Sequence, residues 1–203
     1  MKLIDLSVDL NEKTPIYPGD PVTKIAPSAV METDGYEDHY VSVGTHVGTH
    51  VDAPRHMLAG GKSLDKYPIE KFIGRGVVIS CGKEITLEKV KEEDILEGDI
   101  VLFNTGMSKE YFQSSYYDNY PAIGTEIADY LVNKKIKMVG VDMCSVDHEP
   151  FDIHRLLLKN DILIIENLTN LDVLVGKNFT VYALPLKLQI DGSPARVFAQ
   201  INQ

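Results

Sequence analysis

The sequence predicts an α/β fold in a single domain spanning residues 1–203, with a mixed sheet that helices cover on at least one side. Two observations carry this prediction. The first part of the chain is rich in short alternating or apolar segments typical of strands. The second part alternates such segments with amphipathic ones typical of helices. No internal repeat or flexible linker divides the sequence.

The expected strands are segments that either alternate or are β-branched and apolar. In chain order they are Leu3–Leu10, Tyr40–Val43, Gly76–Cys81, Asp99–Phe103, Met138–Val141, Ile162–Ile165, Thr180–Leu184 and Arg196–Ile201. Three helices are expected between them, each with a polar capping residue. They are Leu87–Glu92 after Thr86, Glu126–Lys134 after Thr125, and Ile153–Lys159 after Asp152.

The composition favours a soluble protein that acts on a small molecule. A formal net charge of −10 without a basic stripe argues against binding to nucleic acid or to an anionic membrane. No apolar run approaches the roughly 20 residues of a membrane helix, and Asp5 and Asp9 interrupt the N-terminus, which excludes a signal peptide. The cytoplasm is the expected location. Cys81 and Cys144 are expected to be buried, unpaired thiols.

The most informative feature is a dense cluster of histidines. His46, His50, Asp52 and His56 fall within eleven positions, and the whole chain has only six histidines. Single histidines are more often hydrogen-bonded structural residues than metal ligands, but this density favours a metal site.

The spacing of these residues restricts how they can act together. A straight strand would separate His46 from His50 by about 13 Å at ~3.3 Å per residue, too far for one ion. A helix would turn Asp52 about 200° away from His50, and the valines, threonines and proline also disfavour it. The segment is therefore expected to leave its strand and curl, with Gly44 and Gly48 supplying backbone freedom. A curled loop aims both imidazoles and the carboxylate at one point and leaves a coordination position open.

The motif resembles the H-x-G-T-H-x-D-x-P-x-H signature of the cyclase-like metal hydrolases, which include bacterial kynurenine formamidases and isatin hydrolases. The resemblance extends to most of the chain, at Pro15–Asp20, Gly140–Asp142, Ser145–Asp147, His154–Leu158 and Ile164–Leu168. It implies a β/β/α "swivelling" fold, with a mixed sheet or partial barrel covered by helices.

The resemblance also implies a two-metal site and a role for each ligand. His46, His50 and Asp52 would hold the first ion, and Asp52 would bridge to a second ion completed by His154 and Glu166. Zinc is the first expectation from this ligand set and manganese the alternative. Asp142 and Asp147 are candidates for orienting ligands, and Asp191-Gly192 is interpreted as a turn.

The implied reaction is hydrolysis of an amide, formamide or lactam C–N bond by metal-activated hydroxide, with His56 as the acid–base residue. N-formylkynurenine is the best single substrate expectation. Tyr17 is expected to contact the substrate, at a position where the formamidases usually carry tryptophan. The aromatic residues Tyr111, Phe112, Tyr116, Tyr117 and Tyr120 are expected either to line a pocket or interface or to pack beneath a loop.

Two other functions stay open on the sequence alone. One is a lactone or ester hydrolase or cyclase of the same family. The other is a non-catalytic metal-binding protein on this scaffold, which would have a closed coordination shell and no role for His56. By analogy with the family, a homodimer or larger homo-oligomer is expected.

Overall fold

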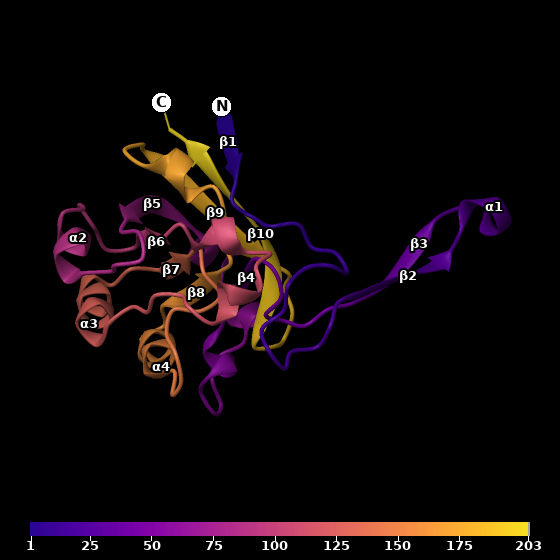
Figure 1. The fold of residues 1–203 in the computed structure, drawn as a ribbon, viewed down its shortest axis with the longest axis horizontal. Coiled ribbons are helices and arrows are strands. Elements are labelled where there is room, and N and C mark those ends of the chain that lie inside the picture. Colours follow the sequence, from indigo (N-terminus) through magenta and orange to yellow (C-terminus); the bar gives the residue numbers. More distant parts are fainter. Residues whose placement is uncertain (203) are drawn as a thin grey trace.

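A computed structural model describes residues 1–202, and eight of its strands form one mixed sheet (Figure 1). Across the sheet the order is β1-β10-β4-β8-β7-β6-β5-β9, and β9 also pairs with β10. That last pairing closes the seven strands from β10 to β9 into a barrel, with β1 attached at β10. The strands are β1 Lys2–Asp5, β4 His50–Asp52, β5 Ile73–Ser80, β6 Ile100–Asn104, β7 Met138–Val141, β8 Leu163–Glu166, β9 Phe179–Pro185 and β10 Gly192–Ile201.

The four central strands β5, β6, β7 and β8 run parallel, and the other pairings of the sheet are antiparallel. Parallel neighbours need a crossover connection, and here the crossovers carry the helices. They are α2 Leu87–Lys91, α3 Thr125–Lys134 and α4 Asp152–Lys159, which lie together on one side of the barrel (Figure 1). The expected α/β fold with a helix-covered mixed sheet is confirmed.

Short 3₁₀ turns complete the connections. They are η1 Pro54–His56, η2 Leu64–Lys66, η3 Ile69–Phe72, η4 Met107–Glu110, η5 Ser114–Tyr117 and η6 Leu171–Leu174.

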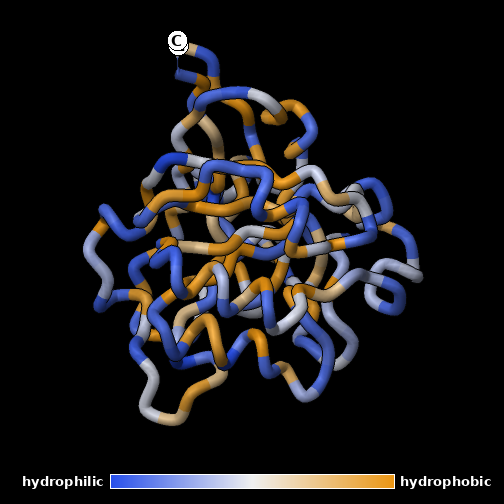
Figure 2. The backbone as a smooth tube through the Cα atoms, turned by 90° about the vertical axis from the view of Figure 1, so that its left-hand side faces the viewer, coloured by the Kyte–Doolittle hydropathy of each residue, from blue (hydrophilic) through white to orange (hydrophobic). Residues whose placement is uncertain are grey.

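Two hydrophobic clusters lie on opposite faces of the parallel strands. Val78 and Leu102 belong to the cluster inside the barrel, to which all seven of its strands contribute. Val77 and Val101 belong to the outer cluster, which includes apolar side chains of the three helices. Because successive strand residues point to opposite faces, continuous apolar runs are required here. Figure 2 shows the same arrangement, with hydrophobic backbone segments at the centre and hydrophilic ones around them.

Most expected elements are present with shifted ends. Met138–Val141 has the expected bounds, whereas β1 covers only Lys2–Asp5 instead of Leu3–Leu10. Thr86 caps α2 as expected, accepting a hydrogen bond from the Lys89 amide. The expected caps Thr125 and Asp152 are instead the first residues of α3 and α4, and neither forms a side-chain cap.

A long hairpin extends away from the barrel. We call residues 22–42 the arm; it contains β2 Lys24–Ala29, α1 Met31–Asp34 and β3 Asp38–Ser42. The expected strand Tyr40–Val43 overlaps β3, but β3 pairs only with β2 in a separate two-stranded sheet. Figure 1 shows the arm projecting far beyond the other elements.

Within the described residues, none of the helices is long and apolar enough to cross a membrane.

The packing around β7 leads to a stability prediction for Gly140→Ala. A methyl group at this position would lie 2.5 Å from the Leu102 side chain and 2.7 Å from that of Leu168. Overpacking of a full core costs about 1–3 kcal/mol. Urea unfolding of Gly140→Ala should therefore show a free energy of unfolding lower by that order. Gly124 has open space around its Cα, and Gly124→Ala is the control, expected to cost less than about 1 kcal/mol. Equal stabilities for the two variants would contradict the packing described here.

Candidate metal centre

Strand β4 forms one side of the site. It lies between β10 and β8, and its register places His50 directly opposite Glu166. Val51 points into the barrel interior, so His50 and Asp52 share the opposite face, towards α4. All three polar side chains are buried, with exposed fractions of 1% for His50, 1% for Asp52 and 5% for Glu166.

His46 reaches the same place from the turn before β4. Gly48 has φ +63°, so the chain turns between His46 and His50 as the sequence predicts, whereas Gly44 is not in the left-handed region. Gly192, opposite Asp52 on β10, leaves the room that the His46 ring occupies. A Cβ on Gly192 would lie 2.6 Å from His46 Cε1.

Asn167, the residue after β8, holds this turn in place. Its side-chain amide nitrogen donates to the Gly48 backbone carbonyl at 3.0 Å, and its backbone carbonyl accepts from the Thr49 hydroxyl at 2.6 Å. The buried Tyr116 hydroxyl in turn donates to the Asn167 side chain at 2.8 Å. The turn that carries two histidines is therefore tied to the strand that carries Glu166.

Each of the three expected ligand histidines is held through one ring nitrogen by an acceptor outside the ligand set. His50 Nδ1 lies 2.8 Å from the Gly48 carbonyl, and His154 Nδ1 lies 2.5 Å from Asp147 Oδ1. His46 uses the other ring position, with Nε2 2.8 Å from Asp191 Oδ2. Such contacts fix the orientation of metal-binding imidazoles, because the remaining nitrogen must point away from the acceptor.

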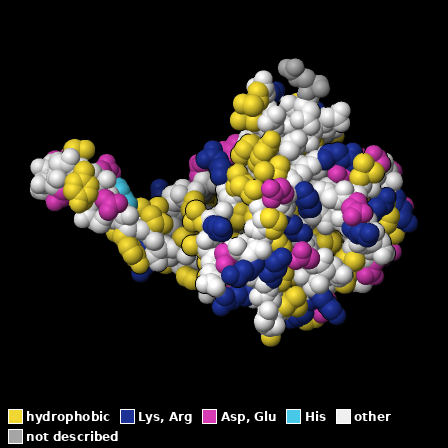
Figure 3. All heavy atoms as spheres, turned by 180° about the vertical axis from the view of Figure 1, so that it is seen from behind, with side chains coloured by type: hydrophobic (Ala, Val, Ile, Leu, Met, Phe, Trp, Pro, Cys, Tyr) yellow, Lys and Arg dark blue, Asp and Glu magenta, His cyan; other side chains and the backbone are white. Residues whose placement is uncertain are grey.

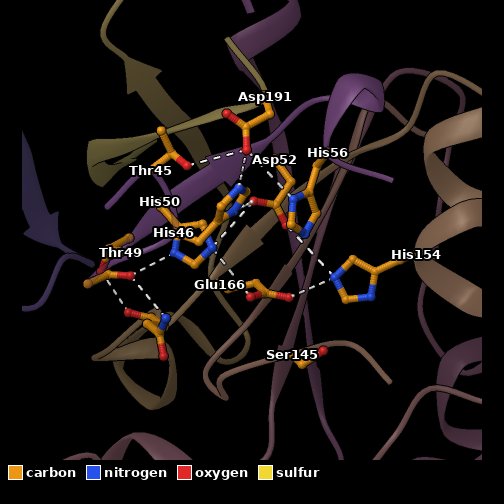
Figure 4. Close-up of polar contacts among 12 residues, drawn as sticks. Thr45, His46, Thr49, His50, Asp52, His56, Ser145, His154, Glu166 and Asp191 are labelled. Carbon is orange, nitrogen blue, oxygen red and sulfur yellow. Dashed lines mark hydrogen bonds and ion pairs between the residues drawn. The ribbon is translucent and has the colours of Figure 1, made fainter. Parts of the chain in front are cut away.

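The remaining nitrogens all point towards Asp52 and Glu166 (Figure 4). His46 Nδ1 lies 2.7 Å from Asp52 Oδ1, and His154 Nε2 lies 3.2 Å from Glu166 Oε1. His50 Nε2 lies between the two carboxylates, 3.4 Å from an oxygen of each. The structure therefore brings together five side chains that are up to 120 positions apart in the sequence (166 − 46).

Two buried atoms of this cluster have no hydrogen-bond partner, His50 Nε2 and Asp52 Oδ2. His50 Nδ1 donates to the Gly48 carbonyl and therefore carries a proton. In the neutral ring Nε2 then has the free lone pair. Leaving such groups buried and unpaired is costly, and a cation supplies the missing partner. Suitable ligand atoms of His50, Asp52 and Glu166 lie within 4.8 Å of one another. The residues present therefore fit a divalent ion.

His56 lies at the margin of the cluster, in η1 immediately after β4. Its ring stacks against that of His46 with centroids 3.9 Å apart, and its side chain is 25% exposed. Ligand atoms of His46, Asp52 and His56 also lie within 4.8 Å of one another, so proximity alone does not distinguish a metal ligand from a proton carrier here.

The charges of the cluster shift the pKa values strongly. Burial opposes imidazolium, yet Asp52 and Asp191 outweigh it and raise the pKa of His46 to about 10. Burial also opposes protonation of His154. Its hydrogen bonds to carboxylates outweigh burial and raise its pKa to about 10. Burial alone would raise the pKa of Asp52, but the imidazoles around it hold that pKa well below its usual value. His56 differs, because burial and the neighbouring histidines lower its pKa against the attraction of Asp52.

A small cavity of about 200 Å³ opens beside the cluster. His46, His56, His154 and Glu166 line it, and so does Tyr17. The remaining lining residues are Asp20, Met57, Cys144, Ser145 and Phe151. A small molecule can therefore approach the candidate ligands directly.

The aromatic stretch after β6 mainly packs in the core. Tyr111, Tyr116 and Tyr120 are at most 5% exposed, whereas Phe112 is 71% exposed. Tyr117 packs edge-to-face against Tyr17, with centroids 5.7 Å apart. Of the two interpretations left open by the sequence, packing describes most of these residues, and Tyr117 supports a wall of the cavity. Both cysteines are buried and free, as expected.

Three aspartates have contacts that the sequence indicated only in part. Asp147 orients His154, as proposed for it, and also accepts a hydrogen bond from the Ile153 amide at the start of α4 at 2.7 Å. Asp142 does not reach the cluster, because it binds Thr105 and Gly106. Asp191, interpreted as part of a turn, was missed as the partner of His46. In the sequence Asp191 is marked only by the glycine that follows it, which indicates a turn. Its contact with His46 joins residues far apart in the chain and leaves no local pattern.

The sequence model of the family described as "Putative cyclase" matches residues 4–148, more than half of the chain. The chain belongs to this family of cyclase-like hydrolases. The match includes His46, His50, Asp52 and His56 and ends before His154 and Glu166.

Relatives of this cyclase-family protein extend the likeness to nearly the whole chain. An uncharacterized protein of Methanocaldococcus jannaschii is 36% identical over 201 residues, which cover 98% of this chain and 99% of that protein. The kynurenine formamidase of Bacillus mycoides is 33% identical over 202 residues, which cover 95% and 94%.

Solved structures share the fold. Isatin hydrolase A from Labrenzia aggregata bound to benzyl benzoate superposes with a TM-score of 0.89 at 26% identity, covering 100% of this chain and 94% of that one. A structure described as a potential metal-dependent hydrolase with cyclase activity has a TM-score of 0.80 at 29% identity, covering 98% and 96%.

The contact between Asp191 and His46 predicts that Asp191→Asn weakens metal binding. The asparagine side chain is uncharged, so it cannot balance a positive charge on the His46 ring that it contacts. Loss of such an orienting group typically reduces metal affinity about 10- to 100-fold. Competition with a chromogenic chelator measures the affinity. Asp129→Asn is the control, because Asp129 is exposed on α3. An unchanged affinity in Asp191→Asn would show that this contact has no part in metal binding.

The raised histidine pKa values predict how the metal-free protein responds to pH. His46 and His154 have pKa values of about 10 in the folded protein, against 6.5 for an ordinary histidine. Their contribution to stability is therefore complete below about pH 6.5 and is lost as the pH rises through about 10. Urea unfolding of the metal-free protein should show that its free energy of unfolding falls across this pH range. In His46→Gln this fall should be smaller.

Metal ions compete with these protons for the same nitrogens. Adding Zn²⁺ to metal-free protein near neutral pH should therefore release protons, which titration in weakly buffered solution detects. Binding without proton release would contradict the charge states described above.

Proposed function

We propose that the protein is a metal-dependent hydrolase that cleaves a C–N bond in an amide, formamide or lactam. His46, His50 and Asp52 would hold one divalent ion, and Asp52, His154 and Glu166 a second. The observation that carries the proposal is the pair of unpartnered buried atoms, His50 Nε2 and Asp52 Oδ2, beside a cavity open to small molecules. Zinc is the first choice of ion and manganese the second.

Relatives support this type of reaction. One relative is a kynurenine formamidase and one structural neighbour an isatin hydrolase, each named for hydrolysis of a nitrogen-containing compound. Both share the present fold or sequence over nearly their whole length. N-formylkynurenine is the best single substrate proposal for this chain.

The bound ions would supply a water nucleophile available at neutral pH and positive charge to stabilise the oxyanion of the reacting carbonyl. Asp52 cannot carry a proton in this reaction, because the cationic groups around it keep its carboxylate ionised.

His56 has the properties of the acid–base residue. It lines the cavity, and its lowered pKa leaves the imidazole free to accept a proton near neutral pH. It can then return that proton to the leaving nitrogen. Its neighbours His46 and His154 are engaged by carboxylates at both ring nitrogens and are not free for this task.

Tyr17 is proposed to contact the substrate. Its ring lies in the cavity wall and is supported edge-to-face by Tyr117, so it presents a fixed surface for an aryl group. The cytoplasmic location and the homodimer expected from the sequence stay predictions.

A substrate panel tests the proposal. Metal-free protein is loaded with Zn²⁺ or Mn²⁺ and supplied with N-formylkynurenine, isatin and simple lactones. We expect hydrolysis of a C–N substrate that depends on added metal. Preference for lactones would indicate the ester-hydrolase alternative, and metal binding without turnover of any substrate would indicate a binding protein.

Variants in the same assay separate the roles of the residues. Glu166→Ala should lose both metal and activity. His56→Gln should keep its metal and reduce kcat by about 10²- to 10⁴-fold. Asp129→Asn, at an exposed position on α3, is the control and should leave both unchanged. Full kcat in His56→Gln would remove His56 from the mechanism.

A further inference from the structure

A carboxylate that the proposed mechanism does not use lines the cavity beside the candidate metal centre. Asp20 is half-buried and is one of the ten residues that line this cavity. Within the part of the chain that the structure describes, its side chain forms no hydrogen bond and no ion pair, and only its backbone amide is engaged. By contrast, His46, His154 and Glu166 in the same lining all have partners. Asp20 therefore offers a free negative charge to a molecule that enters the cavity.

A tight turn holds Asp20 in this place. The Asp20 amide donates to the Tyr17 carbonyl at 3.0 Å. Pro18 and Gly19 occupy the two central positions, and Gly19 has φ +99°, which is the combination typical of a type II turn. The backbone thus fixes the carboxylate of Asp20 and the ring of Tyr17 relative to each other, and both residues line the cavity.

Packing on both sides supports the turn. The Tyr17 ring lies edge-to-face against Tyr117, and the next residue, Pro21, lies beside Gly44, whose added Cβ would be 3.7 Å from Pro21 Cδ. Burial raises the pKa of the Tyr117 phenol, and the charge of Asp20 is among the neighbouring groups that raise it further. The carboxylate of Asp20 and the two tyrosine rings therefore lie together.

The same cavity has no basic side chain for a carboxylate of a ligand. None of its ten lining residues, all of which the structure describes, is a lysine or an arginine. These residue types are not scarce on the molecule, because Figure 3 shows many of them on one face of the barrel. In the metal-loaded protein an anionic group of a ligand would find positive charge only at the ions, whereas a cationic group would find Asp20.

A free carboxylate beside aromatic rings is suited to an ammonium group. The carboxylate accepts a charge-assisted hydrogen bond, which is stronger than one between neutral groups. The faces of aromatic rings attract cations as well. A neutral hydrogen-bond donor would gain less from this arrangement, and an anion would be repelled by it.

We propose that Asp20 determines substrate specificity by binding an ammonium group of the substrate. The preferred substrate is then an aryl amide or formamide whose side arm carries a cationic amine. This inference rests on the proposed hydrolase function and adds a substrate class to it. Isatin, which has no such amine, would be a poorer substrate than a formamide of this class.

Two formamides that differ in one charged group test the proposal. N-formylkynuramine carries an ammonium group and no carboxylate, and in the formamide of ortho-aminobutyrophenone a methyl group replaces that ammonium. The wild type loaded with Zn²⁺ should favour the charged compound in kcat/KM. Asp20→Asn should reduce the ratio of the two kcat/KM values about ten- to hundredfold, the range expected for a hydrogen bond to a charged group. The change should lie mainly in KM, because Asp20 contacts no reacting atom.

Asp118→Asn is the matched control for loss of one negative charge. Asp118 is exposed, follows Tyr117 in the chain and does not line the cavity, so this variant should keep the wild-type ratio. Asp20→Glu retains the charge and should keep part of the preference. A wild type without preference for the charged formamide, or a ratio unchanged in Asp20→Asn, would overturn the proposal.

A binding measurement separates this proposal from the hydrolase proposal. Titration calorimetry of Zn²⁺-loaded protein with kynuramine and with ortho-aminobutyrophenone needs no turnover. Kynuramine should bind the wild type more tightly than Asp20→Asn, whereas the neutral ketone should distinguish the two proteins much less. This result would support the role of Asp20 even if neither formamide were hydrolysed. Equal affinities of both proteins for kynuramine would overturn that role even if both formamides were hydrolysed. Circular dichroism checks that each variant is folded.

Discussion

The candidate site depends on the register of a strand only three residues long. Because β4 lies between β8 and β10, its register fixes two contacts at once. Glu166 lies opposite His50 on one side, and Gly192 lies opposite Asp52 on the other. The first contact brings the two halves of the ligand set together, and the second leaves room for His46. A slip by one residue would turn His50 and Asp52 into the barrel and Val51 out of it. The buried Val51 side chain therefore stabilises the register on which the chemistry depends.

Electrostatics then decides the state of the assembled cluster. Asp52, Glu166, Asp147 and Asp191 surround three histidines, and the carboxylates outweigh the cost of burying imidazolium. Protons thus occupy the positions that a divalent cation would take, and the two compete. His56 differs, because among the described residues its ring has no hydrogen bond to a carboxylate, and Asp191 Oδ2 lies 3.8 Å from its Nδ1. That difference separates the proposed proton carrier from the proposed ligands in the same motif.

The sequence predicted the fold class and the parallel strands well, since their apolar runs are long enough to be recognised. The turn between His46 and His50 followed from spacing alone. His154 and Glu166 were placed by resemblance, because a histidine in a helix and a carboxylate at a strand end have no local signal. Asp191 was missed for a related reason: its contact with His46 spans 145 positions and arises only when the barrel closes. The arm was missed because β2 has neither alternation nor a continuous apolar run.

The depth of the cluster has a consequence for ion exchange. His50, Asp52 and Glu166 are almost fully buried, and the cavity lined by His56 and His154 opens beside them. Departure of an ion through it would leave several buried charged groups without a partner, which is costly. Ion exchange and substrate binding would then use the same opening, and a molecule bound in the cavity would slow the exchange of the ion.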